Sequence, residues 1–227
     1  MPIGELAVRE GADPELIEAM MRSLLGQYRD TLDDQARVLA DRYRFVDAAH
    51  KVVGVGSVGT RAWIALLLGR DESDPLFLQV KEAGPSVLEP FVGASGFDHH
   101  GKRVVSGQRL TQAAGDVLLG WLAAEGLDGK KRDFYVRQLW DGKGSAEVDA
   151  MDARTLQSYS QLCGWTLARA HARTGDRRAI AAYLGKGDRF DRAIVEFAGA
   201  YADQNEVDYR ELCAARDRGE LKAESGL

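Results

Sequence analysis

Three glycines and one lysine are the residues of this sequence whose types and spacing most clearly suggest chemistry. Gly54, Gly56 and Gly59 spell G-x-G-x-x-G within KVVGVGSVGTRAW (residues 51–63), directly after an apolar run. Backbone N–H groups in such a loop can approach phosphate oxygens, because glycine has no Cβ to obstruct them. The pattern occurs in dinucleotide-binding units and in protein-kinase loops, and by itself it is equally consistent with a tight structural turn.

The dinucleotide hypothesis makes residues 52–56 a strand and residues 57–68 a helix whose N-terminus faces a pyrophosphate. Glu82 would then bind a ribose, and the protein would be an NAD(P)-binding oxidoreductase. Glu82 lies farther from Gly54 than the roughly 20 residues this motif requires, and the rest of the chain lacks regularly alternating strands. This hypothesis therefore ranks third.

The kinase-type hypothesis makes residues 51–55 and 61–68 two antiparallel strands joined by the glycine turn. Residues 76–80 form a third strand that ends in Lys81, whose charge would face the α- and β-phosphates of ATP bound with Mg²⁺. Ser57, at the tip of the loop, adds a hydrogen-bond donor. The alternative for Lys81 is a solvated lysine at a strand end.

Two further positions complete the predicted ATP site. A buried lysine needs a carboxylate partner, and Glu89 is our first choice, because Glu82 points to the opposite face of the strand from Lys81. DFYVRQLWD predicts another strand, which is followed by a hinge whose backbone at Gln138 and Leu139 would meet the adenine.

The elements that must position these residues follow from local patterns. Asp13-Pro14 is typical of a helix start, and a second helical pattern includes Leu32, Ala36, Leu39, Tyr43 and Val46. Further helices are expected over residues 103–121, from the cap Asp152 to about residue 173, and over about 190–218, ending near Gly219. We expect three regions: a helical segment 1–48, a nucleotide-binding lobe 49–141 and a helical lobe 142–227.

Composition excludes several classes of protein. The 227 residues include 45% apolar and 29% charged residues, no run approaches the roughly 18 apolar residues of a membrane span, and no secretory signal is visible. A net charge of −5 argues against broad binding to nucleic acid. Two cysteines are too few for a disulfide framework. We expect a cytoplasmic protein that does not bind membranes or nucleic acid, and no metal site at the adjacent His99 and His100.

The chain also resembles a known family. From VVGVGSVGTRAW and LFLQVKEAGPSVLEP through HGKRVVSGQRLTQAAGDVLLGW, DFYVRQLWDGKGS, LCGWTLARAHARTGD and YLGKGDRFDRAIVEFAGAYADQNEVDY, it is similar to the carboxy-terminal half of the bacterial family named domain of unknown function 2252. The resemblance covers about residues 35–222. That family looks like a distant relative of protein kinases and aminoglycoside phosphotransferases, which implies an α+β kinase-like fragment with a small antiparallel sheet and a helical lobe.

The resemblance also implies what this chain lacks. Full-length relatives carry a Gly-Asp-x-His-x-x-Asn stretch and an Asp-rich motif that would supply the catalytic base and the magnesium ligands. Neither motif occurs here: the only asparagine is Asn205, and position 200 is alanine. We therefore expect a nucleotide-binding fragment or shortened protein that is inactive alone, with a missing amino-terminal half or a second copy of itself as partner. The alternative is a noncatalytic scaffold.

Overall fold

The computed structural model describes residues 13–50, 59–126, 128–140 and 144–221. The chain divides into two compact units, Met1–Thr174 and Gly175–Leu227. The helices are α2 (Pro14–Arg29), α3 (Asp34–Ala40), α4 (Glu89–Val92), α5 (His100–Thr111), α6 (Ala153–Thr174), α7 (Arg177–Leu184) and α8 (Arg189–Asp217), with a 3₁₀ turn at Val148–Ala150. The strands are β1 (Arg44–His50), β2 (Ala62–Leu68), β3 (Pro75–Ala83), β4 (Gly120–Glu125) and β5 (Lys131–Gln138).

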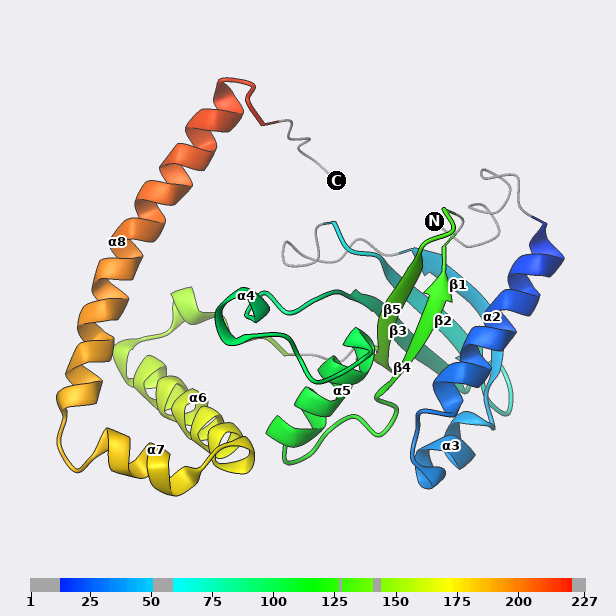
Figure 1. Cartoon of the computed structure of the whole chain (residues 1–227), viewed down its shortest axis with the longest axis horizontal. Coiled ribbons are helices and arrows are strands. Elements are labelled where there is room, and N and C mark those ends of the chain that lie inside the picture. Colours follow the sequence, from blue (N-terminus) through cyan, green and yellow to red (C-terminus); the bar gives the residue numbers. More distant parts are fainter. Residues whose placement is uncertain (1–12, 51–58, 127, 141–143, 222–227) are drawn as a thin grey trace. The chain divides into compact units, whose positions relative to one another are not determined.

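The first unit is an α+β structure built on one five-stranded sheet. The strand order is β1-β2-β3-β5-β4, and each pair of neighbours runs antiparallel. Figure 1 shows α2 and α3 on one side of this sheet and α5 on the other. Because side chains alternate between the two faces of a strand, each face has its own partners.

The face toward α2 and α3 carries the hydrophobic core. Leu67, Leu78 and Val136 on the strands pack there with Tyr28 and Leu32. On β3, Leu76 and Leu78 belong to this cluster, and the partly buried Val80 packs against it. The intervening residues Phe77, Gln79 and Lys81 therefore lie on the opposite face.

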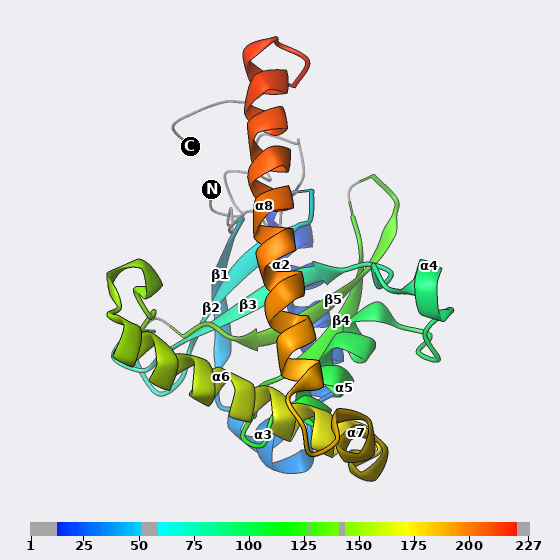
Figure 2. The ribbon, with the colours of Figure 1, turned by 90° about the vertical axis from the view of Figure 1, so that its left-hand side faces the viewer.

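That opposite face is partly covered by α5. The helix begins beside β5, where the His100 N–H donates to the Asp133 carboxylate (2.7 Å). Farther along, the Lys102 ammonium lies over the Trp121 ring, 6.0 Å from its centroid, and the Arg109 guanidinium donates to the Leu119 carbonyl at 2.6 Å. Helix α6 contacts α5, and the two are neighbours in both views (Figure 1, Figure 2).

Several helix boundaries confirm the sequence predictions. The Asp13 carboxylate accepts the Glu15 N–H at the start of α2, and the Asp152 carboxylate accepts the Thr155 N–H at the start of α6. Gly219 follows α8 with a φ of 73°, in the left-handed region that favours glycine. The sequence predicts these helix boundaries because each boundary depends only on neighbouring residues.

Two helix predictions were wrong. The second helical pattern, which included Tyr43 and Val46, is interrupted: α3 ends at Ala40, and β1 begins at Arg44 and pairs with β2. The helix expected over residues 103–121 ends at Thr111, and Trp121 lies on β4 opposite Tyr135. In both cases pairing with a strand distant in the sequence overrode a helical apolar pattern.

The strand layout decides between the two predicted arrangements of the glycine segment. Residues 62–68, expected as part of a helix in the dinucleotide hypothesis, form β2 and pair with β1 and β3. That helix prediction was wrong. The antiparallel arrangement of the kinase-type hypothesis is observed, with β1 at Arg44–His50. The strand predicted at residues 51–55 lies outside the described part of the chain.

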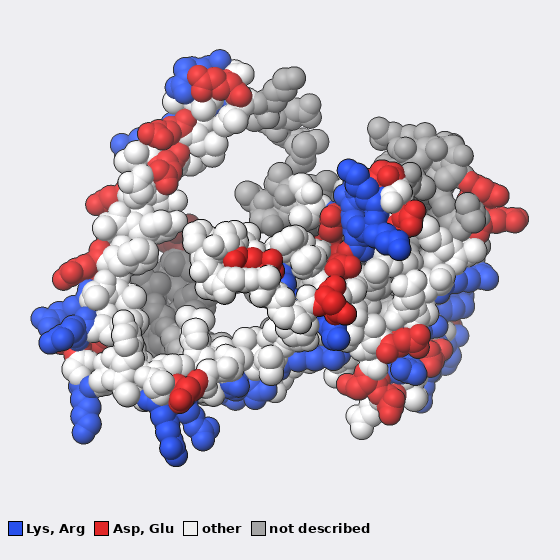
Figure 3. Space-filling model, in the orientation of Figure 1, with Lys and Arg blue, Asp and Glu red and all other residues white. Residues whose placement is uncertain are grey.

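The second unit contains α7 and α8. The Asp176 carboxylate accepts the N–H groups of Arg178 and Ala179 and so caps α7. Helix α8 is 29 residues long, and its charged side chains gather along one side (Figure 3). Within the described ranges, no helix is both long enough and apolar enough to cross a membrane.

Candidate nucleotide site beside the glycine-rich connection

The glycine segment connects β1 to β2, as the kinase-type hypothesis predicts. Gly54, Gly56 and Ser57 lie outside the described residues. Gly59 is described and has a φ of 81°, which favours glycine because a Cβ would be strained there. Gly59 therefore has a conformation that favours glycine shortly before the start of β2.

Lys81 lies on β3 at the same end of the sheet as this connection. It stands opposite Ala62 of β2 and Tyr135 of β5. All three belong to the sheet face on which α5 packs, and Tyr135 in turn stands opposite Trp121. Burial raises the pKa of the Tyr135 phenol, while the Arg137 guanidinium partly offsets this. The sheet thus brings Lys81 beside a half-buried aromatic side chain and a second cation, Arg137.

Glu89, the predicted carboxylate partner of Lys81, begins the short helix α4. Its carboxylate accepts the Ser86 N–H at 3.2 Å, within its own turn. Helix α5 supplies no alternative, because its sequence HGKRVVSGQRLT contains no acidic residue. Pairing of Lys81 with Glu89 stays a prediction.

Gln138 and Leu139, the predicted hinge, lie at the end of β5 and just after it. The Gln138 N–H donates to the Asp116 carboxylate at 2.6 Å, and the Leu139 N–H donates to the Phe77 carbonyl at 2.8 Å. Since both N–H groups are already used, an adenine bound here would meet carbonyl oxygens of this segment or the N–H of Trp140. Asp116, which fixes the end of β5, was not identified from the sequence.

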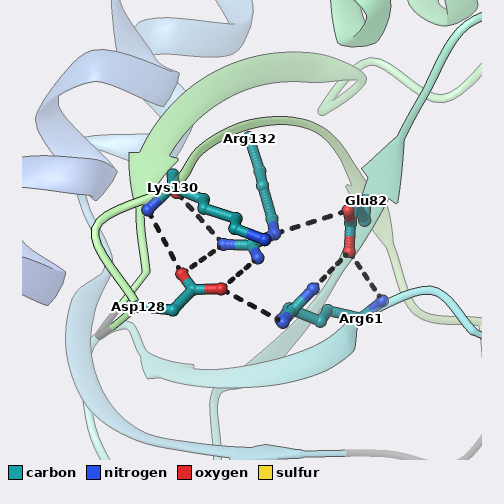
Figure 4. A network of polar contacts seen from close by, with 5 residues as sticks. All are labelled: Arg61, Glu82, Asp128, Lys130 and Arg132. Carbon is teal, nitrogen blue, oxygen red and sulfur yellow. Dashed lines mark hydrogen bonds and ion pairs between the residues drawn. The ribbon is translucent and has the colours of Figure 1, made fainter.

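An ion-pair network holds the residue that follows the glycine connection (Figure 4). The Glu82 carboxylate accepts the Arg61 N–H at 3.0 Å and lies 3.3 Å from Nη1 of the same residue and 3.6 Å from Arg132 Nε. Asp128 forms a bidentate pair with the Arg132 guanidinium, and Arg61 Nη2 lies 3.9 Å from the same carboxylate. Glu82 therefore fixes the entry to β2, and the ribose role of the dinucleotide hypothesis is not needed to explain it.

The positive charges of this network stabilise the ionised form of the Asp128 carboxylate. Hydrogen bonds from Arg132 hold the pKa of the Asp128 carboxyl well below its usual range, with smaller contributions from the Lys130 N–H and from Arg61. Asp128 is therefore ionised at all moderate pH values. In Figure 3, acidic and basic side chains lie next to each other near the tip of the β4–β5 hairpin.

Replacing Glu82 with glutamine should loosen the end of the glycine connection. The substitution removes the negative charge between Arg61 and Arg132, and we expect the free energy of unfolding to fall by about 1 kcal/mol. Amide exchange measured by NMR should accelerate at Arg61, whose N–H bonds to Glu82. Glu72→Gln, in the exposed β2–β3 turn, is the matched control; equal exchange at Arg61 in both variants would contradict the anchoring role.

The adjacent histidines His99 and His100, at which the sequence predicts no metal site, lie at the start of α5. The His99 Nδ1 accepts the Lys102 N–H at 3.2 Å, and Nε2 lies 3.4 Å from Asp133 Oδ1, so His99 caps the helix. In the part of the chain that the structure describes, no group of three or more His, Cys, Asp or Glu residues could hold a metal ion.

A polar pair that the sequence analysis missed lies between Lys81 and the end of β5. Gln79 stands opposite Arg137, and both Nε and Nη2 of Arg137 donate to Gln79 Oε1, at 3.1 and 3.0 Å. The two-residue alternation of β3 could have placed Gln79 on the Lys81 face. Its partner could not be found without the register between β3 and β5.

Together, the fold and this face define an α+β protein with an antiparallel sheet, in which Lys81 stands opposite the first residue of the strand that follows the glycine motif. The family model described as an uncharacterized protein conserved in bacteria (DUF2252) matches residues 11–215. The chain therefore belongs to this bacterial family, as the resemblance predicted. Neither the curated proteins nor the solved structures gave a match. The relation of the family to protein kinases stays a prediction.

Proposed function

We propose that this chain binds ATP with Mg²⁺ as the nucleotide-binding portion of a kinase-like phosphotransferase. One observation carries the proposal: the glycine-rich connection joins two antiparallel strands, and the next strand places Lys81 at the same end of the sheet. Protein kinases use a glycine-rich loop over the phosphates and a lysine on the third strand in this way. A helix and two more strands follow in the chain, as α5, β4 and β5.

The proposed roles follow from chemistry at each position. Backbone N–H groups near Gly54, Gly56 and Gly59, with the Ser57 hydroxyl, would donate to phosphate oxygens, and Lys81 would neutralise part of their charge. Phosphoryl transfer also needs a carboxylate that orients the acceptor and ligands for magnesium. A segment with the Gly-Asp-x-His-x-x-Asn pattern would have to supply them, so the activity of this chain alone is limited to binding.

Thermal unfolding with and without Mg-ATP tests the proposal. At about a hundred times its dissociation constant, ATP should stabilise the protein by roughly 2.7 kcal/mol, a rise in Tm of about 5–10 °C. Lys81→Ala should lose most of this rise because it removes the cation that faces the phosphates. Lys131→Ala, an exposed lysine at the start of β5, is the matched control and should keep it. A rise with NAD alone, or an equal rise in Lys81→Ala, would contradict the proposal.

A second candidate function is a noncatalytic scaffold, and the surface of α8 favours it. Large apolar side chains are exposed along this helix at spacings of three or four residues, at Phe190, Ile194, Phe197 and Tyr201. An apolar face of this kind is typical of a surface that associates with another protein or with a second copy. No rise in Tm with ATP, together with self-association in analytical ultracentrifugation, would favour this candidate over nucleotide binding.

A further inference from the structure

Among the described residues Arg137 has no acidic partner, unlike the other arginine on the same strand. Arg132 contacts two carboxylates, those of Asp128 and Glu82. Arg137 donates only to the side-chain oxygen of Gln79, through Nε and Nη2, and Nη1 makes no hydrogen bond with the described residues. No described carboxylate lies within ion-pair distance of Arg137, so its charge is not compensated within this part of the protein.

Holding an uncompensated guanidinium there is costly, because Arg137 is only partly exposed and Gln79 is buried, with 4% of its surface accessible. Within the described ranges, Gln79 is the only polar or charged residue that is buried. Its amide oxygen fixes the guanidinium with two hydrogen bonds. Because the amide is neutral, it orients Arg137 without cancelling the charge, which a carboxylate at this position would do.

The position of Arg137 relates it to Lys81. Gln79 stands opposite Arg137 and Lys81 stands opposite Tyr135, so the two cations are diagonal neighbours on one sheet face. Diagonal neighbours on antiparallel strands lie about 7–8 Å apart. That separation suits two anionic groups of one ligand, and a guanidinium fork is well matched to phosphate oxygens.

We propose that Arg137, oriented by Gln79, is an anion-binding residue that forms a second phosphate position beside Lys81. This inference rests on the proposed nucleotide site and extends it toward the end of β5. The phosphate would belong either to the bound nucleotide or to a separate phosphorylated ligand.

The decisive variant is Gln79→Glu, which keeps the size of the side chain and adds a negative charge. A carboxylate would bind the Arg137 guanidinium at least as well as the amide does, so we expect an unchanged or higher Tm. The charge available to a ligand would be cancelled, so binding of Mg-ATP and of pyrophosphate, measured by calorimetry, should weaken about 10- to 100-fold. Arg137→Met should weaken binding similarly but also lower the Tm. Arg70→Met, which removes an exposed arginine paired with Asp71, is the matched control.

The ligand series separates the possible results. Weaker binding of ATP with unchanged binding of adenosine assigns the position to the nucleotide phosphates. Weaker binding of pyrophosphate alone assigns it to a separate phosphorylated ligand. If the wild type binds pyrophosphate through Arg137 but no nucleotide, this inference stands and the proposed function fails. If Lys81→Ala loses ATP binding while Gln79→Glu and Arg137→Met bind both ligands like the wild type, the role of Arg137 is overturned and the proposed function stands. A wild type that binds neither ligand overturns both.

Discussion

Gly101→Ala should lower the free energy of unfolding by about 3 kcal/mol, because the backbone of α5 approaches the sheet too closely for any side chain. A Cβ at this position would lie 2.7 Å from the Phe134 carbonyl carbon, a distance that real Cβ atoms essentially never show. Neither backbone can yield without moving α5 away from β5. Urea-induced unfolding followed by circular dichroism measures the change.

Gly107→Ala is the matched control for this prediction. Gly107 lies on the same helix, and a Cβ there meets no atom within 4 Å. Since alanine favours helix over glycine by about 1 kcal/mol, this variant should be at least as stable as the wild type. Equal destabilisation by the two substitutions would contradict the role that we assign to the close contact between Gly101 and Phe134.

Tyr28→Ala should lower the free energy of unfolding by about 4 kcal/mol, because this ring joins α2 to β4 at the centre of the core. Tyr28 is 1% exposed, and its hydroxyl donates to the Leu118 carbonyl at 2.6 Å. The ring also lies against Gly120: a Cβ there would be 2.8 Å from Tyr28 Cε2. Tyr28→Phe keeps the ring and leaves the Leu118 carbonyl without its donor, so we expect a loss of about 1–2 kcal/mol. A loss as large as that of Tyr28→Ala would contradict this division between ring and hydroxyl.

The same residue makes stability depend on alkaline pH. Burial raises the pKa of Tyr28 far above its ordinary value of 10.0, and the Asp116 carboxylate raises it further. The stabilisation is complete below pH 10 and is lost as pH rises above it, because the unfolded chain then releases a proton that the folded chain keeps. Each pH unit costs up to about 1.4 kcal/mol. Tyr28→Phe should show a shallower decline between pH 10 and 11.5 than the wild type, and identical slopes would contradict the assignment.

The parts of the candidate site differ in how far the sequence alone predicts them. Some depend on adjacent residues, and others depend on pairing between strands far apart in the sequence. The strand around Lys81 was predictable, since residues 75–83 contain a long apolar stretch bounded by a turn, and period-2 alternation correctly put Glu82 on the opposite face. The sequence also placed the glycine motif directly before the strand that is observed as β2, and Gly59 has the conformation that favours glycine. Arg137 was missed, because only the pairing of β3 with β5 brings it to Gln79.

The incorrect predictions have a common physical cause. Residues 44–50 carry apolar side chains at spacings that also suit a helix, and they become a strand because β2 offers an edge for pairing. Residues 120–125 behave similarly, and Gly120 is needed there because α2 lies directly against it. A local pattern records which residues are apolar, but it does not record which neighbour will cover them.

The sequence by itself determined the features that depend on adjacent residues: the helix starts at Asp13 and Asp152, the turn at Gly219, the glycine motif, and the family to which the chain belongs. Only the tertiary structure decided the strand order β1-β2-β3-β5-β4 and the face that Lys81 shares with Arg137. Caps and turns are stabilised by bonds within a few residues, so the sequence carries them directly. Strand register is fixed by burial and pairing between segments far apart in the chain, and these exist only once the sheet has formed.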